Sequence, residues 1–304
     1  MKEFRTIAFV AGLAGGFLLA GSASAGQPAF AAPEAALEAF RVALAAPDGS
    51  ALLELLGDEH RDELIGADPA SARQTMAAVR NAAAEAIALA PGDAPGTFDV
   101  LLGRAGWPMP IPLVQTAEGW VFDTEAGLEE IIDRRIGENE LAAIAAARAY
   151  VEAQLLYGSV DRNGDGVPEF AQRLVSTPGE HDGLFWPTAA GEEPSPLAPL
   201  ASSEADYLAY RESGEPYYGY RFKVLTAQTG NALGGAYEYL INGRMLAGFG
   251  LLAWPADYGN SGIMSFIVNQ LGDVYEADLG EGTDAVAEAI TAFDPAADWA
   301  LVED

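Results

Sequence analysis

Residues 161–169 carry the residue types and the spacing of a calcium-binding loop. Acidic or amide side chains stand at alternate positions, so their oxygens can converge as the chain curls, and Gly166 permits the sharp turn. Oxygen ligands of this kind favour Ca²⁺ over softer metals. The oxygen-bearing residues that we expect to hold a structural Ca²⁺ ion are Asp161, Asn163, Asp165, Val167 (through its carbonyl) and Glu169.

The same segment departs from a complete calcium loop in one place. Gln172 stands at the twelfth position, where a Glu that binds through both oxygens is expected. The residues that follow are not helical in pattern, so a paired helix–loop–helix hand is not predicted. The alternative is an Asx-rich turn whose side chains cap their own backbone. Both interpretations stay open at this point.

A second cluster could carry hydrolytic chemistry. His181 lies between Glu180 and Asp182, with Ser176 and Thr177 close in sequence, and these types could supply a base and a nucleophile. Neighbours in sequence seldom face one site, however, and a triad is recognised by geometry. The alternative is a solvated turn, so we assign no catalytic residue here.

Composition excludes several classes of function. The 304 residues include 16 basic and 45 acidic side chains, a net charge of −29, which argues against nucleic acid and anionic membranes as partners. Cys is absent and His60 and His181 are the only histidines, which excludes disulfides, thiolate sites and a multi-histidine metal centre. We expect His60 to lie on a charged helix face. Half of the residues are apolar, enough for a sizeable core.

The first 25 residues have the pattern of a signal peptide. Lys2 and Arg5 precede an apolar stretch over residues 7–20, and small residues at 23 and 25 form a cleavage site. Cleavage after Ala25 would leave a short flexible leader, residues 26–32. No later stretch is apolar over the roughly 20 residues that a membrane span needs. We therefore expect a periplasmic or secreted protein without a membrane span.

The remaining chain divides into two predicted lobes with an α+β fold. Residues 33–136 are expected to form an N-terminal lobe of helices and a small sheet. The elements predicted there are helices over 34–44, from Ser50 and over 70–90, strands over 97–102, 111–115 and 119–122, and a helix over 125–134.

Residues 137–304 are expected to form a long helix packed on an antiparallel β-meander. Apolar residues recur at steps of three and four over 139–157, and Gly158 ends this helix. Asn242-Gly243 between two apolar runs predicts a tight hairpin, because both turn positions need positive φ. A further hairpin around residues 272–273 and a helix over 281–293 complete the lobe.

Several motifs give the chain a family resemblance. They occur in the order 107–113 (WPMPIPL), 134–141 (RRIGENEL), 161–169 (DRNGDGVPE), 176–179 (STPG), 242–245 (NGRM) and 254–259 (WPADYG). In these motifs the chain resembles the bacterial secreted family catalogued as domain of unknown function 2950. The resemblance implies an exported bacterial protein and implies no activity. Residues 137–278 also resemble the globular part of type IV pilins and pseudopilins, without the apolar N-terminal helix that packs a filament.

Three functional hypotheses follow from these patterns. The first is an exported, non-catalytic envelope protein, stabilised by Ca²⁺, that acts as a structural or binding module for an envelope protein, peptide or glycan. The second is a periplasmic hydrolase of envelope polymers with a site under the loop 176–216. The third is a pilin-like assembly subunit. Loop aromatics such as Trp186 and Trp254 could contact a glycan or peptide, or close the core.

Overall fold

The computed structural model describes residues 27–46, 49–66, 69–188, 191, 193–198 and 216–303. The predicted signal peptide and parts of the loop 176–216 lie outside these residues. The helices are α1 (Pro33–Ala45), α2 (Ser50–Leu56), the 3₁₀ turn η1 (Asp58–His60), α3 (Arg61–Ile65), α4 (Pro69–Glu85), α5 (Thr124–Tyr157) and α7 (Thr283–Ala289). Of the helices in the described segments, none is long and apolar enough to cross a membrane.

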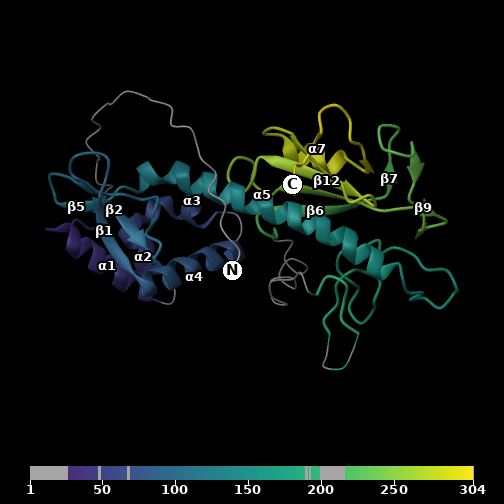
Figure 1. Cartoon of the computed structure of the whole chain (residues 1–304), viewed down its shortest axis with the longest axis horizontal. Helices are drawn as coiled ribbons and strands as arrows, with labels where there is room; N and C mark the ends of the chain where they lie inside the picture. Colours follow the sequence, from purple (N-terminus) through teal and green to yellow (C-terminus); the bar gives the residue numbers. More distant parts are fainter. Residues whose placement is uncertain are drawn as a thin grey trace.

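The N-terminal lobe, from α1 to β5, packs helices on a small antiparallel sheet (Figure 1). Its strands are β1 (Ile87–Pro91), β2 (Thr97–Leu102), β3 (Trp107–Pro108), β4 (Leu113–Gln115) and β5 (Trp120–Phe122). They run in the order β1-β2-β4-β5, with β3 beside β2. Phe40 of α1 meets Phe122 of β5 with ring centroids 5.5 Å apart, which anchors the helix to the sheet. The helices and strands expected here are present, although residues 87–90 belong to β1 instead of the preceding helix.

Residues of the predicted leader are attached to this lobe. Phe30 pairs with Trp120 through two backbone hydrogen bonds of 2.9 and 2.8 Å. The Gln27 side chain donates to the carbonyl oxygens of Leu55 (3.1 Å) and Phe122 (2.6 Å). These contacts extend the edge of the sheet beyond β5.

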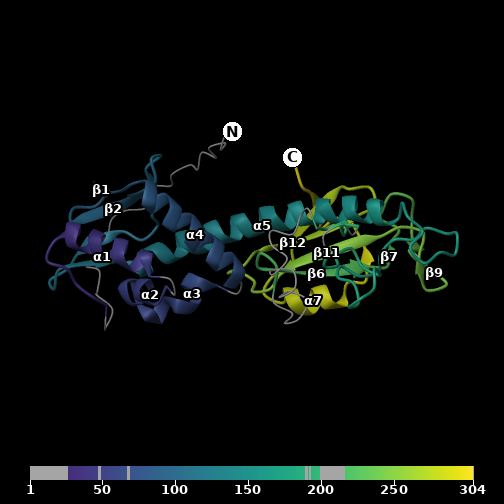
Figure 2. The same cartoon turned by 90° about the horizontal axis from the view of Figure 1, so that it is seen from below.

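Helix α5 connects the two lobes without interruption (Figures 1 and 2). The sequence suggested separate helices over 125–134 and 139–157, with Gly137 between them. A helical glycine costs only about 1 kcal/mol relative to Ala, so it does not end a helix that is buried on both sides of it. The Asp123 carboxylate accepts a hydrogen bond from the Ala126 amide and caps the first turn. The predicted boundary between residues 136 and 137 therefore falls inside α5.

The C-terminal lobe, from β6 to β15, is an antiparallel sheet with α5 on one face and α7 on the other (Figure 2). The sheet has the order β15-β13-β12-β11-β6. Its strands are β6 (Tyr220–Leu225), β11 (Gly250–Pro255), β12 (Met264–Asn269), β13 (Val274–Asp278) and β15 (Ala300–Leu301). The fold is thus α+β, with the long helix on a β-meander as predicted.

Side-chain alternation explains the three layers of this lobe. Along β11, Leu251 and Ala253 face α5, whereas Leu252 and Trp254 face the layer of α7. Both faces are covered, so every residue of β11 is buried. The shorter strands of the lobe are β7 (Ala227–Gln228), β8 (Tyr237–Glu238), β9 (Leu240–Ile241), β10 (Arg244–Met245) and β14 (Ala292–Phe293).

Candidate functional site

The 161–169 loop lies at the C-terminal end of α5 and contacts the β9–β10 hairpin. The Phe170 amide donates to the Met245 carbonyl at 2.8 Å, and the Gln172 side chain donates to the Gly243 carbonyl at 2.9 Å. Asn242 (φ 53°) and Gly243 (φ 79°) form the predicted tight turn. This turn brings the next residue, Arg244, to the loop.

Three of the predicted ligands accept hydrogen bonds from backbone amides of the loop, Asp165 among them, which accepts from the Val167 amide at 2.9 Å. The Asp161 carboxylate accepts hydrogen bonds from the Gly164 and Gly166 amides, both at 2.8 Å. These bonds, that from Gly166 foremost, lower the pKa of Asp161. The Asn163 side-chain oxygen accepts from the Asp165 amide at 3.0 Å, and its nitrogen donates to Glu169 Oε1 at 3.0 Å. These are the Asx turns of the alternative interpretation.

Asp165, Val167 and Glu169 converge on Arg244. Arg244 Nη1 lies 2.8 Å from Asp165 Oδ2, and Nε donates to Glu169 Oε2 at 3.0 Å. Arg244 Nη2 donates to the Val167 carbonyl at 2.8 Å. The Glu169 hydrogen bond, followed by the charges of Asp165 and Glu169, raises the pKa of Arg244. The guanidinium therefore occupies the side of the loop toward which these oxygens point.

The donor types of the loop fit Ca²⁺, because all five predicted ligands offer oxygen. Three of the five, Asp165, Val167 and Glu169, contact a guanidinium instead. Within the described residues, no three His, Asp or Glu side chains gather closely enough to hold a metal ion. Calcium binding by Asp161, Asn163, Asp165, Val167 and Glu169 stays a prediction.

The cluster around His181 is held together by structural contacts. Asp182 accepts from the Thr177 amide (2.6 Å) and from its hydroxyl (2.8 Å). Burial alone would raise the pKa of Asp182, but these bonds and nearby Arg173 lower it. The Ser176 hydroxyl accepts from the Gly183 amide at 3.0 Å. His181 is exposed, and in the described part of the chain its ring stacks on Trp186 at 4.2 Å and bonds to neither hydroxyl. The hydrolase hypothesis required this imidazole beside a hydroxyl and a carboxylate.

Arg162 is a residue whose role the sequence did not indicate. Its guanidinium lies over the rings of Tyr157 (4.8 Å) and Trp186 (5.2 Å) and pairs with Glu193 at 3.2 Å. The alternate spacing of the loop indicates its oxygen-bearing residues as ligands, and Arg162 stands between two of them without a role in that pattern. It fastens the 161–169 loop to the segment that carries Trp186.

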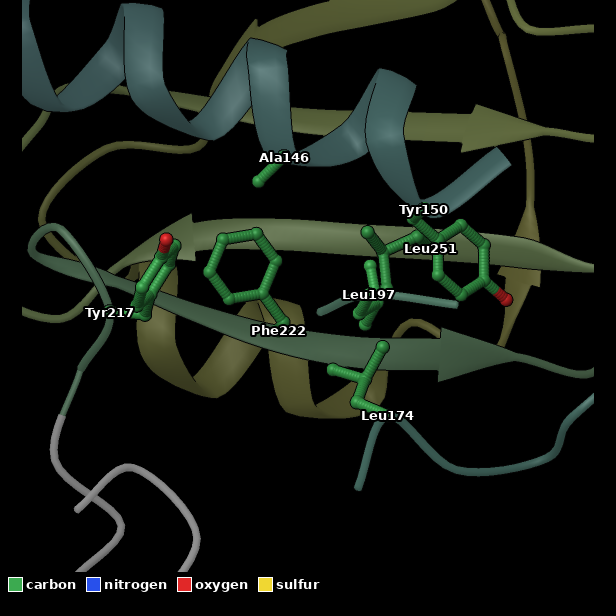
Figure 3. A pocket seen from close by; sticks show the side chains of 7 residues that line it. All are labelled: Ala146, Tyr150, Leu174, Leu197, Tyr217, Phe222 and Leu251. Atoms are coloured by element: carbon green, nitrogen blue, oxygen red, sulfur yellow. The ribbon is translucent and has the colours of Figure 1, made fainter. Parts of the chain in front are cut away.

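The pocket in Figure 3 lies between α5 and the sheet and is apolar. Its empty volume is about 430 Å³, the open side included. The lining residues are Ala146, Tyr150, Leu174, Leu197, Tyr217, Phe222 and Leu251. The Tyr150 hydroxyl at this pocket donates to the Gly250 carbonyl at 3.0 Å and so already has a partner.

A family model described as "Protein of unknown function (DUF2950)" matches residues 27–302. The chain belongs to this family. No curated protein and no solved structure matches it. The likeness to pilins and pseudopilins therefore stays a prediction.

In this DUF2950 protein, two of the motifs that carry the resemblance contact one another, and a third contacts residues 260–264, just after the 254–259 motif. The 161–169 motif contacts the 242–245 motif through Arg244, as described above. The 134–141 motif contacts the segment that follows Trp254. Arg135 Nη1 donates to Asn260 Oδ1 at 2.6 Å, and Asn139 donates to the Ser261 carbonyl at 2.9 Å. Glu140 Oε1 accepts from the amides of Ile263 and Met264, each at 3.0 Å.

Arg135 also reaches the N-terminal lobe of the DUF2950 fold. Its Nη2 donates to the carbonyls of Glu63 and Leu64 in α3, the latter at 3.2 Å. Burial, opposed by the charge of Asp257, lowers the pKa of Arg135. Arg135 thus joins both lobes from the middle of α5.

The aromatic residues singled out in the sequence mostly close the cores of the DUF2950 fold. Trp186 and Trp254 are buried, and the indole of Trp254 donates to Asp284 at 2.8 Å. The Tyr258 hydroxyl donates to Asp278 at 2.9 Å. His60 is half-buried in η1.

Proposed function

We propose that this DUF2950 protein is an exported, non-catalytic protein of the bacterial envelope that acts as a structural or binding module. One observation carries the proposal. The side chains whose chemistry best suits catalysis or ion binding are those of the 161–169 loop and of the His181 cluster. They are engaged in contacts that hold the fold together. Groups that bind substrate or ion need free donors or acceptors, which these contacts use.

Export is supported by the N-terminal pattern. The test is expression of the full chain in a Gram-negative host, followed by fractionation and N-terminal sequencing. The proposal predicts a periplasmic or secreted product that begins at Gly26. A product that retains Met1 and stays in the cytoplasm would contradict export.

The non-catalytic role can be tested with envelope polymers. Purified peptidoglycan incubated with the mature protein should release no soluble fragments. A release that His181→Ala abolishes would instead favour the hydrolase hypothesis and a site under the loop 176–216. The His181→Ala variant should fold, because His181 is exposed.

A pilin-like assembly subunit is the second candidate function. Helix α5 on the β11–β12–β13 meander supports it, whereas the packing of the first part of α5 in the N-terminal lobe does not. Light scattering of the mature protein after size-exclusion chromatography decides between a pilin-like subunit and the non-catalytic module. Assemblies that grow with concentration are expected of such a subunit, and a monomer at all concentrations contradicts it.

Calcium binding by the 161–169 loop stays a prediction from the sequence and is not part of this proposal. An ion bound by all five predicted oxygens would have to displace Arg244 from Asp165, Val167 and Glu169.

A further inference from the structure

The five residues expected to bind one ion make two kinds of contact, and Asp165 makes both. Asp161, Asn163 and Asp165 accept hydrogen bonds from backbone amides of the loop and so fix its path. Asp165, Val167 and Glu169 direct oxygens to a group outside the loop. That group is the guanidinium cation of Arg244, which stands 79 positions after Asp165 in the chain.

The geometry suits a guanidinium. Its three nitrogens reach three residues of the loop: Nη1 reaches Asp165, Nη2 the Val167 carbonyl and, at 3.3 Å, also Asp165, and Nε Glu169. A planar fork can satisfy such divergent acceptors together, whereas an ammonium group cannot span them. Two carboxylates and one guanidinium also leave the cluster with a single excess negative charge, without any ion from solution.

The Arg244 and Glu169 side chains are partly shielded from solvent, which strengthens their contact, whereas Asp165 is exposed. The Arg244 side chain is 27% exposed, that of Glu169 25% and that of Asp165 43%. Charged hydrogen bonds in such surroundings contribute more than ion pairs on the open surface.

We infer that the Arg244 guanidinium is the resident cation of the 161–169 loop and takes the place that the sequence assigns to Ca²⁺. The pattern of a calcium loop serves here as a receptor for an arginine of the same chain. The contact braces the end of α5 against the β9–β10 hairpin, and the Asn242-Gly243 turn sets its register. The inference goes beyond the proposed function and does not depend on it, because the loop would be closed in the same way in an enzyme or a pilin-like subunit.

The test is urea unfolding of the mature protein and of three variants, each with chelator and with millimolar CaCl₂. Arg244→Gln should lower the folding equilibrium constant by about tenfold or more. Arg244→Lys should retain part of that stability, because it keeps the charge and loses the fork. Arg221→Gln is the matched control: Arg221 forms an exposed pair with Asp284 at 3.9 Å, so its loss should change the constant by no more than about twofold to threefold.

The wild-type unfolding midpoint should be the same in chelator and in CaCl₂. A rise of the wild-type midpoint in CaCl₂ would identify the metal as the loop's cation and overturn the inference. Equal stability losses in Arg244→Gln and Arg221→Gln would also overturn it. If Arg244→Gln does not fold, the comparison of Arg244→Lys with wild type in both media gives the same decision.

The pairing itself is tested by a double-mutant cycle with Asp165→Asn. The double variant Arg244→Gln/Asp165→Asn should lose clearly less stability than the sum of the single losses, because each change removes the same contact between Arg244 and Asp165. Additive losses would contradict the pairing.

Discussion

Replacement of Arg135 by Gln should weaken the junction between the two lobes. Arg135 donates to Asn260 on the C-terminal side and to the carbonyls of Glu63 and Leu64 on the N-terminal side. Gln is too short to reach both sides from the middle of α5. The change therefore leaves acceptors on at least one side without their donor.

The size of the effect follows from these contacts. A hydrogen bond from a charged group contributes about 1.5–3 kcal/mol, and bonds from one side chain are not additive, so we expect a loss of about 2–4 kcal/mol. Arg134 is the matched control, since it pairs with Glu130 at 2.6 Å and stacks on Trp107 at 4.7 Å near the surface. Such exposed pairs contribute about 0–1 kcal/mol.

Urea unfolding followed by tryptophan fluorescence and by circular dichroism measures both variants. Arg135→Gln should be less stable than Arg134→Gln by at least about 1 kcal/mol. Equal stability of the two variants would refute the account of the junction.

The orientation of the lobes supplies a second readout. The chain has no Cys, so spin labels can be placed at Val42→Cys and Leu233→Cys, whose native side chains are 63% and 79% exposed. Arg135→Gln should broaden the distance distribution between the labels, and Arg134→Gln should leave it unchanged. A distribution as narrow as that of the parent would mean that Arg135 does not fix the lobes.

Two further predictions concern α5 and the His181 cluster. A Cβ at Gly127 would lie 2.9 Å from the Ile111 Cα, so Gly127→Ala should lower the free energy of unfolding by about 1–3 kcal/mol. Gly137 has open space around it, so Gly137→Ala should raise that free energy by up to about 1 kcal/mol. Equal effects of the two changes in thermal unfolding would contradict this packing. The lowered pKa of Asp182 means that its bonds to Thr177 stabilise the fold above the unfolded-state pKa, about 4, and that this stability is lost as the pH falls through the lower folded-state pKa. The stability difference between wild type and Asp182→Asn should thus be largest at neutral pH and should disappear in strong acid. A difference that stays constant with pH would contradict this role of Asp182.

Local signals in the sequence were sufficient for most elements. Asn242-Gly243 predicts its hairpin because few other residues accept positive φ at both turn positions. Alternating residues of β6 and the repeat of three and four in α5 likewise predict the long helix on the meander. The continuity of α5 was missed because two separate helices were predicted, one on each side of the division between residues 136 and 137, whereas contacts with both lobes keep this segment helical.

The candidate site depended on contacts that spacing does not reveal. The 161–169 loop has the local pattern of a calcium site, and Arg244 looks like an ordinary residue after a turn. Only the fold brings them together, through the bond between Phe170 and Met245. Arg135 and Arg162 were missed for the same reason, since their partners are distant in sequence or are aromatic faces.

Calcium titration calorimetry on the chelator-treated mature protein, residues 26–304, tests the central claim most directly. With Arg244 as the resident cation, the account predicts no saturable heat up to millimolar calcium. Saturable binding of about one ion per chain, lost in Asp165→Ala, would contradict the account and show that the loop is a metal site.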